Sequence, residues 1–189
     1  PKIAIKKDRD STGDWHVRTT AIDGSDDYLV LNTVVPVSAF SASYGSMTSQ
    51  FVTNSASTNG SSEMFYVFAE VEGFSKFGTY TGNGSTNGPY VCTGFRPGFV
   101  VYRRTDQRQA GEAGRWQALD IKRDPSNVTE TGVSWNSNAA ENSGGGYWDI
   151  DILSNGFKLK TTEVEVNNNG SSYLYMAFAE SPFKYANAR

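Results

Sequence analysis

Two glutamates stand at matching places in the sequence, and a pair of carboxylates is the chemistry of a glycoside hydrolase. Glu70 ends the run "MFYVFAE" and Glu180 ends the run "YLYMAFAE". A retaining hydrolase needs one carboxyl group as acid and a second as nucleophile, about 5 Å apart. Matching positions predict matching environments, whereas an acid and a nucleophile need different ones. We therefore interpret both glutamates as polar residues that end a buried strand.

Other residue types that could carry chemistry are scarce. His16 is the only histidine, and Cys92 is the only cysteine, which excludes an internal disulfide and a cysteine-based zinc site. The sequence holds no G-x-S-x-G elbow and no phosphate loop. The acidic stretch at 23–27, and Asp149 with Asp151, lack the ligand spacing of a calcium loop. We therefore expect no catalytic residue, cofactor or metal, and predict that the chain is not an enzyme.

Aromatic side chains remain as candidate ligand contacts. Trp135, Tyr147 and Trp148 flank the glycine-rich loop "NSGGGYW", where a rigid aromatic ring can be displayed to solvent. Trp15 and Trp116 stand instead in the matching motifs "GDW" and "GRW", which favours a core position for both. The surface contact that the sequence predicts is therefore formed by Trp135, Tyr147 and Trp148.

Charge and composition exclude several classes of protein. The 189 residues include 17 basic and 20 acidic side chains, giving a net charge of −3. This balance lacks the electrostatic footprint of a nucleic-acid-binding protein. The sequence has no apolar run of the length that spans a bilayer, so we expect no membrane insertion. The 25 aromatic residues supply large buried areas for a core.

The chain matches itself along much of its length, which indicates an internal repeat. The strings "NGSSEMFYVFAE" and "NGSSYLYMAFAE" share seven of twelve residues at an offset of 110. The offset climbs in steps from 96 to 110, as expected when loops absorb insertions while strands keep their length. The matched segments are, in order, 1–10 with 97–106, 13–15 with 114–116, 31–33 with 135–137, and 59–70 with 169–180.

Both copies have the pattern of β-strands. Short runs rich in β-branched and aromatic residues recur between turns of Gly, Asn and Ser. The runs "MFYVFA" at 64–69 and "YLYMAFA" at 173–179 do not alternate between apolar and polar residues. Because both faces of these runs are apolar, we predict that each is the central strand of its copy.

The predicted fold is all-β, with two tandem duplicated antiparallel β-sandwich-like units. The first unit covers residues 1–80, and residues 81–189 hold a linker strand and the second unit. The linker strand lies in "YVCTGF", before Pro97, and has no counterpart before Pro1.

Several strings resemble a module of tailed-bacteriophage virion proteins, found at the C-terminal end of tail-fibre-like and other virion-surface proteins. They are "FAEVEGFSKFGTYTGNG", "GPYVCTGFRPGFVVYRRTD", "YLYMAFAE" and "PFKYANAR", and the resemblance covers essentially the whole chain. The family has no catalytic motif to carry over. The resemblance implies a structural component of the virion, assembled in the host cytoplasm.

We therefore expect a surface-exposed tail-fibre or adhesion module that contributes to host attachment. The alternatives are a capsid decoration protein and a carbohydrate-binding, lectin-like module. The expected partners are other virion proteins, further copies of the chain, and a host cell-surface glycan or protein. Because symmetric copies multiply weak contacts, a homo-oligomer is expected, and a trimer if the protein is a fibre.

Overall fold

The computed structural model describes residues 1–40, 46–48, 50, 52, 62–106, 114–142 and 145–182. These residues form three antiparallel sheets and one single-turn helix, α1 (Val164–Asn167). The first sheet has the order β4-β3-β2-β1-β5. Its strands are β1 (Ile3–Asp8), β2 (His16–Thr19), β3 (Asp27–Val30), β4 (Ser38–Ala39) and β5 (Glu63–Phe68).

The other two sheets are built from the rest of the chain. The central sheet has the order β10-β9-β8-β13-β6, and the third sheet has the order β11-β12-β7. The central strands are β6 (Ser75–Thr81), β8 (Pro97–Arg104), β9 (Gln117–Asp120), β10 (Gly132–Ser134) and β13 (Ser172–Ala179). The strands of the third sheet are β7 (Tyr90–Cys92), β11 (Ile150–Leu153) and β12 (Gly156–Leu159).

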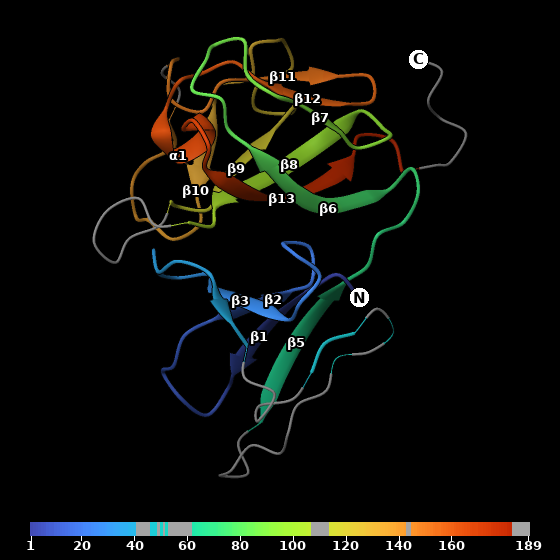
Figure 1. Cartoon of the computed structure of the whole chain (residues 1–189), viewed down its shortest axis with the longest axis vertical. Helices are drawn as coiled ribbons and strands as arrows, with labels where there is room; N and C mark the ends of the chain where they lie inside the picture. The colour runs from blue at the N-terminus through green and yellow to red at the C-terminus, as the bar shows by residue number, and fades with distance from the viewer. Residues whose placement is uncertain are drawn as a thin grey trace.

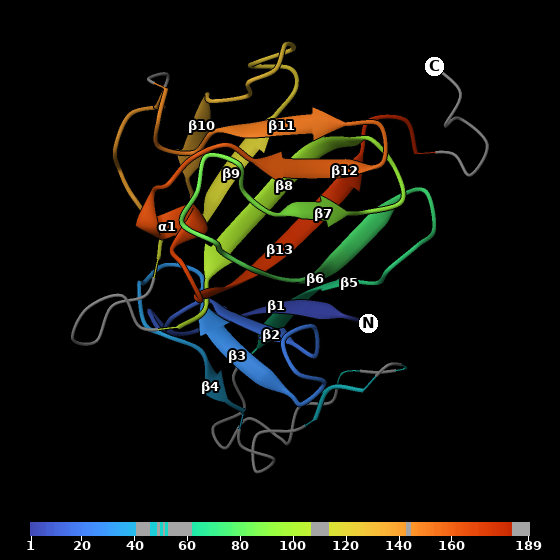
Figure 2. The ribbon, with the colours of Figure 1, turned by 45° about the horizontal axis from the view of Figure 1, so that its top comes forward.

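The three sheets form three layers, with the central sheet in the middle (Figures 1 and 2). One apolar cluster fills the space between the central and third sheets, and includes Tyr102, Leu119, Phe157 and Tyr175. A second cluster fills the space between the central and first sheets. Both faces of the central sheet are therefore buried, and the predicted all-β, sandwich-like fold is confirmed.

The run at 173–179 lies in β13, inside the central sheet between β8 and β6. Tyr173 and Tyr175 point toward the third sheet, whereas Leu174 and Met176 point toward the first sheet. All four side chains are buried. The run does not alternate because each of its faces packs against a different sheet, so the prediction of a central strand is confirmed here.

The same prediction is wrong for the run at 64–69. Residues 64–68 of this run lie in β5, which is at the end of the first sheet and pairs with β1. Phe68 packs into the cluster below the central sheet, but Tyr66 and Val67 are exposed. Apolar residues on both faces indicated a strand covered on both sides. Among the described residues, however, no further sheet covers the outer face of the first sheet.

Four strands of each large sheet share one order and one register. The order β3-β2-β1-β5 in the first sheet corresponds to β10-β9-β8-β13 in the central sheet. Ile5 pairs with Val17 in the first sheet. Val101 lies 96 residues after Ile5, Ala118 lies 101 residues after Val17, and these two residues pair in the central sheet. Likewise, adding 96 to the residue numbers of β1 and 110 to those of β5 turns the β1–β5 pairs into the β8–β13 pairs. These offsets are those of the sequence matches, which supports the interpretation of a duplicated unit.

The tryptophan motifs make the same hydrogen bond in both sheets. The backbone N–H of Trp15 donates to Asn32 Oδ1 at 2.9 Å, and that of Trp116 donates to Asn136 Oδ1 at 3.0 Å. Trp116 is buried, and Trp15 is half-buried against the same cluster between the two sheets. Both indoles therefore lie in or against this core, as their matched positions suggested.

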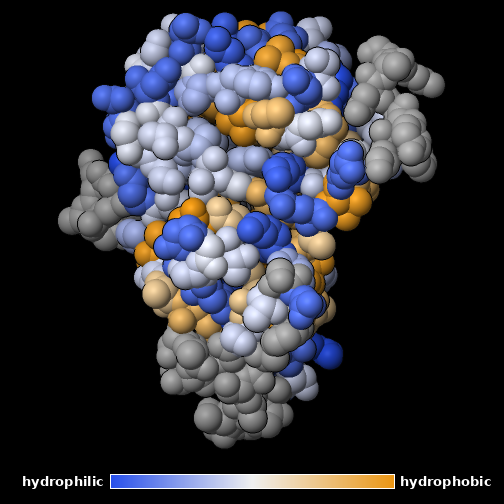
Figure 3. All heavy atoms as spheres, turned by 45° about the vertical axis from the view of Figure 1, so that its right-hand side comes forward, coloured by the Kyte–Doolittle hydropathy of each residue, from blue (hydrophilic) through white to orange (hydrophobic). Residues whose placement is uncertain are grey.

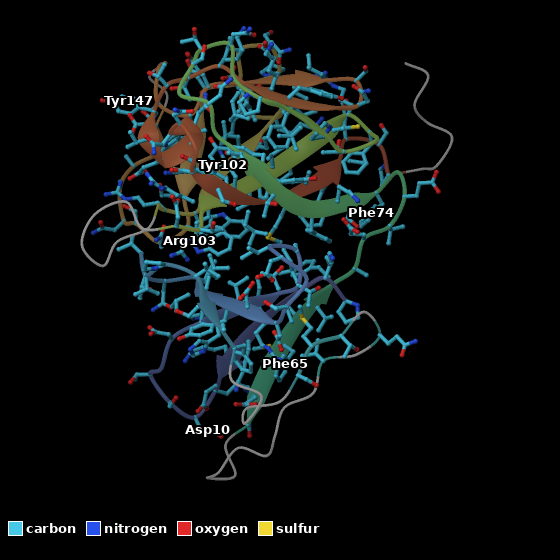
Figure 4. The ribbon with its side chains drawn as sticks, viewed as in Figure 1. Asp10, Phe65, Phe74, Tyr102, Arg103 and Tyr147 are labelled. Carbon is cyan, nitrogen blue, oxygen red and sulfur yellow. The ribbon has the colours of Figure 1, made fainter. Side chains whose placement is uncertain are left out.

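The chain passes from the first sheet to the central sheet between β5 and β6. The expected boundary after residue 80 falls inside β6, which pairs along its length with β13. The strand expected before Pro97 is β7, which pairs with β12 in the third sheet. The two large sheets are also joined by Arg103, whose guanidinium donates to Val30 O at 2.5 Å and to Val35 O (Figure 4). Burial lowers the pKa of Arg103 to about 10.

Candidate functional site

A groove of about 480 Å³ opens on the third-sheet side of β9 and β10. This volume lies within the range of small-molecule sites. Its walls come from the end of β10, the loop that follows it, the turn before β11 and the start of α1. The lining residues are Arg115, Ser134, Ala139, Ala140, Glu141, Asn142, Tyr147, Trp148, Glu163 and Glu165.

Two of the three predicted contact residues line this groove. Tyr147 has 57% of its surface exposed and lies at the outer margin of the molecule (Figure 4). Trp148 is only 9% exposed, so it is part of the groove wall rather than a displayed ring. Trp135 does not line the groove: its ring packs against Phe99 at 6.2 Å between centroids, toward the first sheet. Within the loop "NSGGGYW", Ser143 and Gly144 lie outside the described residues.

A set of hydrogen bonds, one of them buried, fixes the turn that carries Tyr147. Tyr102, on the central sheet, donates its hydroxyl to Trp148 O at 3.1 Å. The N–H of Gly146 donates to Asp149 Oδ1 at 2.8 Å, and Thr161 Oγ1 donates to Gly146 O at 2.6 Å. Because the backbone on both sides of Tyr147 is held, its ring is presented with little loss of conformational freedom on binding.

The opposite wall is held by two stacked tyrosines beneath α1. The rings of Tyr80 and Tyr173 lie 4.9 Å apart and nearly parallel. Their hydroxyls donate to Val166 O at 2.9 Å and to Val164 O at 2.8 Å. Burial raises the pKa of Tyr80 well above its ordinary value and that of Tyr173 to about 12. Both hydroxyls therefore stay protonated, and remain donors, through the neutral range.

Polar groups line the groove beside the aromatic ring. Glu165 Oε2 accepts a bond from Gln117 Nε2 at 3.0 Å, and Glu141 forms an ion pair of 2.7 Å with Arg123. Arg115 adds a guanidinium to the lining. Carboxylates accept hydrogen bonds from hydroxyl groups, and a guanidinium donates them. An exposed tyrosine ring beside such groups suits a ligand with many hydroxyls and an apolar face, which is the chemistry of a sugar.

Sequence reasoning missed the polar half of this groove. Arg115, Glu141, Glu163 and Glu165 come from separate segments that meet only in the folded chain. The partial signal is the alternation of acidic and apolar residues in "TEVEV" at 162–166, a pattern that is typical of a strand. The segment instead forms the single turn α1, held by the tyrosines below it.

Glu70 and Glu180, the two glutamates at matching places in the sequence, each form an ion pair with a different basic residue. Glu70 Oε1 lies 3.0 Å from Lys76 Nζ, and Glu180 Oε2 lies 2.9 Å from Arg96 Nε. Neither glutamate lines the groove around Tyr147. Their separate ion pairs favour the interpretation of polar residues at strand ends.

His16 lies on β2, and its ring contacts Tyr28 edge-on at 5.7 Å between centroids. Desolvation and the nearby charge of Lys6 lower its pKa. Over the described parts of the chain, no three His, Cys, Asp or Glu side chains are grouped closely enough to hold a metal ion. Asp149, weighed above as a calcium ligand, accepts the Gly146 N–H instead.

Residues 1–182 match the model of a protein family described as a domain of unknown function, DUF7483. The chain belongs to the DUF7483 family. The match includes every strand described above, so this DUF7483 domain comprises all three sheets. No curated protein and no solved structure matches the chain. In the described ranges of this DUF7483 domain, no helix has the length and apolar character needed to cross a membrane.

Proposed function

We propose that the chain is a non-enzymatic surface module of a tailed-phage particle, and that the groove around Tyr147 binds a cell-surface glycan during host attachment. The phage context rests on the resemblance of the sequence strings to virion-surface modules. The glycan rests on the groove, which places an exposed tyrosine ring beside carboxylates and a guanidinium. This combined adhesion and lectin-like role is the function that the geometry supports best.

The observation that carries the proposal is the position of Tyr147. It is the most exposed large apolar side chain among the described residues, yet the turn beneath it is tied to the central sheet by the Tyr102 hydroxyl. Covering the exposed area of this ring with the apolar face of a ligand would contribute favourably to binding. A rigid, amphipathic ring at the margin of a polar groove is what a sugar-binding surface uses.

Binding of host surface polysaccharide, measured by titration calorimetry, tests the proposal. We expect Tyr147→Ala to weaken binding by about tenfold or more, the effect of removing a central aromatic contact. Tyr90→Ala is the matched control, because Tyr90 is 45% exposed on β7 and does not line the groove. Equal losses in the two variants, or no binding by the unsubstituted chain, would contradict the glycan assignment. Sustained cleavage of the polysaccharide would contradict the non-enzymatic part of the proposal.

The role on the particle needs a separate test. Particles that lack the chain should adsorb to host cells more slowly than intact particles if the chain contributes to attachment. Equal adsorption would contradict the adhesion role. If such particles also lost integrity on heating, the result would assign the chain to capsid decoration.

A further inference from the structure

Exposed apolar side chains are concentrated in one short segment. Of the nine large apolar side chains that are exposed among the described residues, five lie within residues 64–74. They are Met64, Tyr66, Val67, Val71 and Phe74, from β5 and the turn that follows it. Apolar surface gathers at the waist where the first and central sheets meet (Figure 3), and Phe74 lies at this level (Figure 4). A patch of this kind marks an interaction surface.

The backbone of β5 adds a second property to this patch. The N–H of Arg9 donates to Ser62 O at 2.8 Å. In the β1–β5 register, the backbone groups that face β1 are therefore those of the even-numbered residues of β5, beginning with Met64. Hydrogen bonds of an antiparallel strand alternate between its two sides. The N–H and C=O groups of Phe65 and Val67 therefore point away from β1. No described strand pairs with them.

The central sheet shows what occupies this side of the corresponding strand. Tyr175 and Ala177 of β13 correspond to Phe65 and Val67 at the offset of 110. They pair with Gly78 and Lys76 of β6, an antiparallel strand. This edge of β13 is therefore paired with a strand, whereas the corresponding edge of β5 is paired with no described strand.

We propose that β5 pairs antiparallel with β5 of a second copy of the chain, so that the two first sheets become one continuous sheet. The twofold axis passes beside Phe65, which faces its own symmetry mate, and Met64 of one copy faces Tyr66 of the other. Such apolar cross-strand pairs stabilise a sheet. This isologous contact is the commonest form of closed oligomer.

Charge favours a second copy as the occupant. Glu63 is the one charged residue of β5, and its carboxylate forms an ion pair of 2.5 Å with Lys6 of the same chain. In the twofold register Glu63 lies opposite Val67 of the partner, so like charges do not face each other. Residues 64–68 also contain no lysine or proline, the residues that commonly keep edge strands apart. The strand is therefore complementary to itself.

The contact is independent of the proposed glycan site, because β5 does not line the groove around Tyr147. It produces a twofold pair, which differs from the trimer expected of a fibre. The inference can therefore fail while the glycan proposal stands, and the reverse is also true.

Sedimentation velocity over a concentration series tests the pairing. The chain should reach twice its monomer mass, and Val67→Lys should remain a monomer at every concentration. Val35→Lys is the matched control, since Val35 is 40% exposed and lies outside the patch, and it should dimerise normally. A monomeric unsubstituted chain, a higher oligomer, or a Val67→Lys variant that still dimerises would overturn the proposal.

Disulfide trapping tests the register without relying on a destabilising charge. In a Cys92→Ser background, a mixture of Met64→Cys and Tyr66→Cys chains should form a disulfide-linked heterodimer under mild oxidation. Those two positions form a non-hydrogen-bonded pair, where side chains approach most closely. A mixture of Val35→Cys with Tyr66→Cys should give no more linked product than random collision. If the two mixtures gave equal amounts, the proposed register would be wrong.

Discussion

The outer face of the first sheet and the corresponding face of the central sheet share a backbone but carry different side chains. Lys6 in the first sheet corresponds to Tyr102 in the central sheet, and Arg18 corresponds to Leu119. Tyr102 and Leu119 are buried beneath the third sheet. Lys6 forms an ion pair with Glu63 instead. At these two positions the face that a sheet covers is aromatic and aliphatic, whereas the face without a described covering sheet carries charged side chains.

The contrast shows that register and side-chain chemistry are set by different factors. Register follows from the strand lengths and the hydrogen-bonding pattern, which both sheets keep. The chemical type of each side chain follows from whether another layer of the protein covers it. Arg18 is buried all the same, because it pairs with Asp26 and lies 3.9 Å over the ring of Phe40. Phe65 and Val67 are apolar residues on the same outer face, at the edge of the sheet, and the proposed second copy accounts for them.

Truncating a matched aromatic pair should give the largest difference between the sheets. Tyr175→Ala should lower the free energy of unfolding by about 3–5 kcal/mol, because it empties a packed site between two sheets. Phe65→Ala, at the corresponding position of β5, should cost about 1 kcal/mol in dilute protein. Urea denaturation of both variants measures the difference. Equal losses would mean that β5 is as fully covered as β13.

A matched cationic pair gives a smaller contrast. Arg103 corresponds to Lys7, and each donates to two backbone carbonyls, but Arg103 is buried between the sheets. Arg103→Ala should cost about 3 kcal/mol, because it removes a buried side chain and leaves the Val35 carbonyl without its Arg103 donor, while Val30 O keeps only the bond from Trp116 Nε1. Lys7→Ala should change stability by less than about 0.5 kcal/mol. Thermal unfolding compares the two, and a strongly destabilised Lys7→Ala variant would contradict the assignment of the inter-sheet contact.

Alkaline pH should act on the central and third sheets before the first sheet. Burial raises the pKa values of Tyr173 and Tyr175 from 10.0 to about 12, and raises those of Tyr80 and Tyr102 well above their ordinary value. The folded chain therefore holds these protons after the unfolded chain has lost them. Their stabilising contribution is complete below pH 10 and is lost as pH rises through the folded-state values. Unfolding followed by tyrosinate absorbance should show late, cooperative ionisation; four early, independent titrations would contradict the buried positions.

Acid should have the smallest effect, and should act on the first sheet through His16. Its pKa is lowered from 6.5, chiefly by desolvation and then by the charge of Lys6. The unfolded chain therefore binds the proton first, so stability is complete above pH 6.5 and falls as pH drops through the folded-state value. His16→Gln introduces the residue found at the corresponding position, Gln117. The variant should lose less stability than the unsubstituted chain between pH 6.5 and pH 5, and an unchanged slope would assign the acid sensitivity elsewhere.

Sequence reasoning could predict the matching strand orders of the two large sheets, because the offsets between the matched strings are also the offsets between their paired strands. It placed β13 correctly, since "YLYMAFA" is apolar on both faces and is buried on both. The same reasoning failed for β5, because an apolar face indicates that something covers it but not whether the cover belongs to the same chain. The carboxylates of the groove could not be predicted for another reason: Glu141 and Glu165 come from separate segments that meet only when the second half of the chain has folded.

The edge of β13 that faces away from β8 pairs with β6, whereas no described strand pairs with the corresponding edge of β5. Backbone hydrogen exchange tests this difference most directly. The amides of Tyr175 and Ala177 should be protected at every protein concentration, because their N–H groups face β6. The amides of Phe65 and Val67 should exchange rapidly in dilute protein and become protected as the concentration is raised. Protection of Phe65 and Val67 that does not change with concentration, whether high or low, would contradict the account.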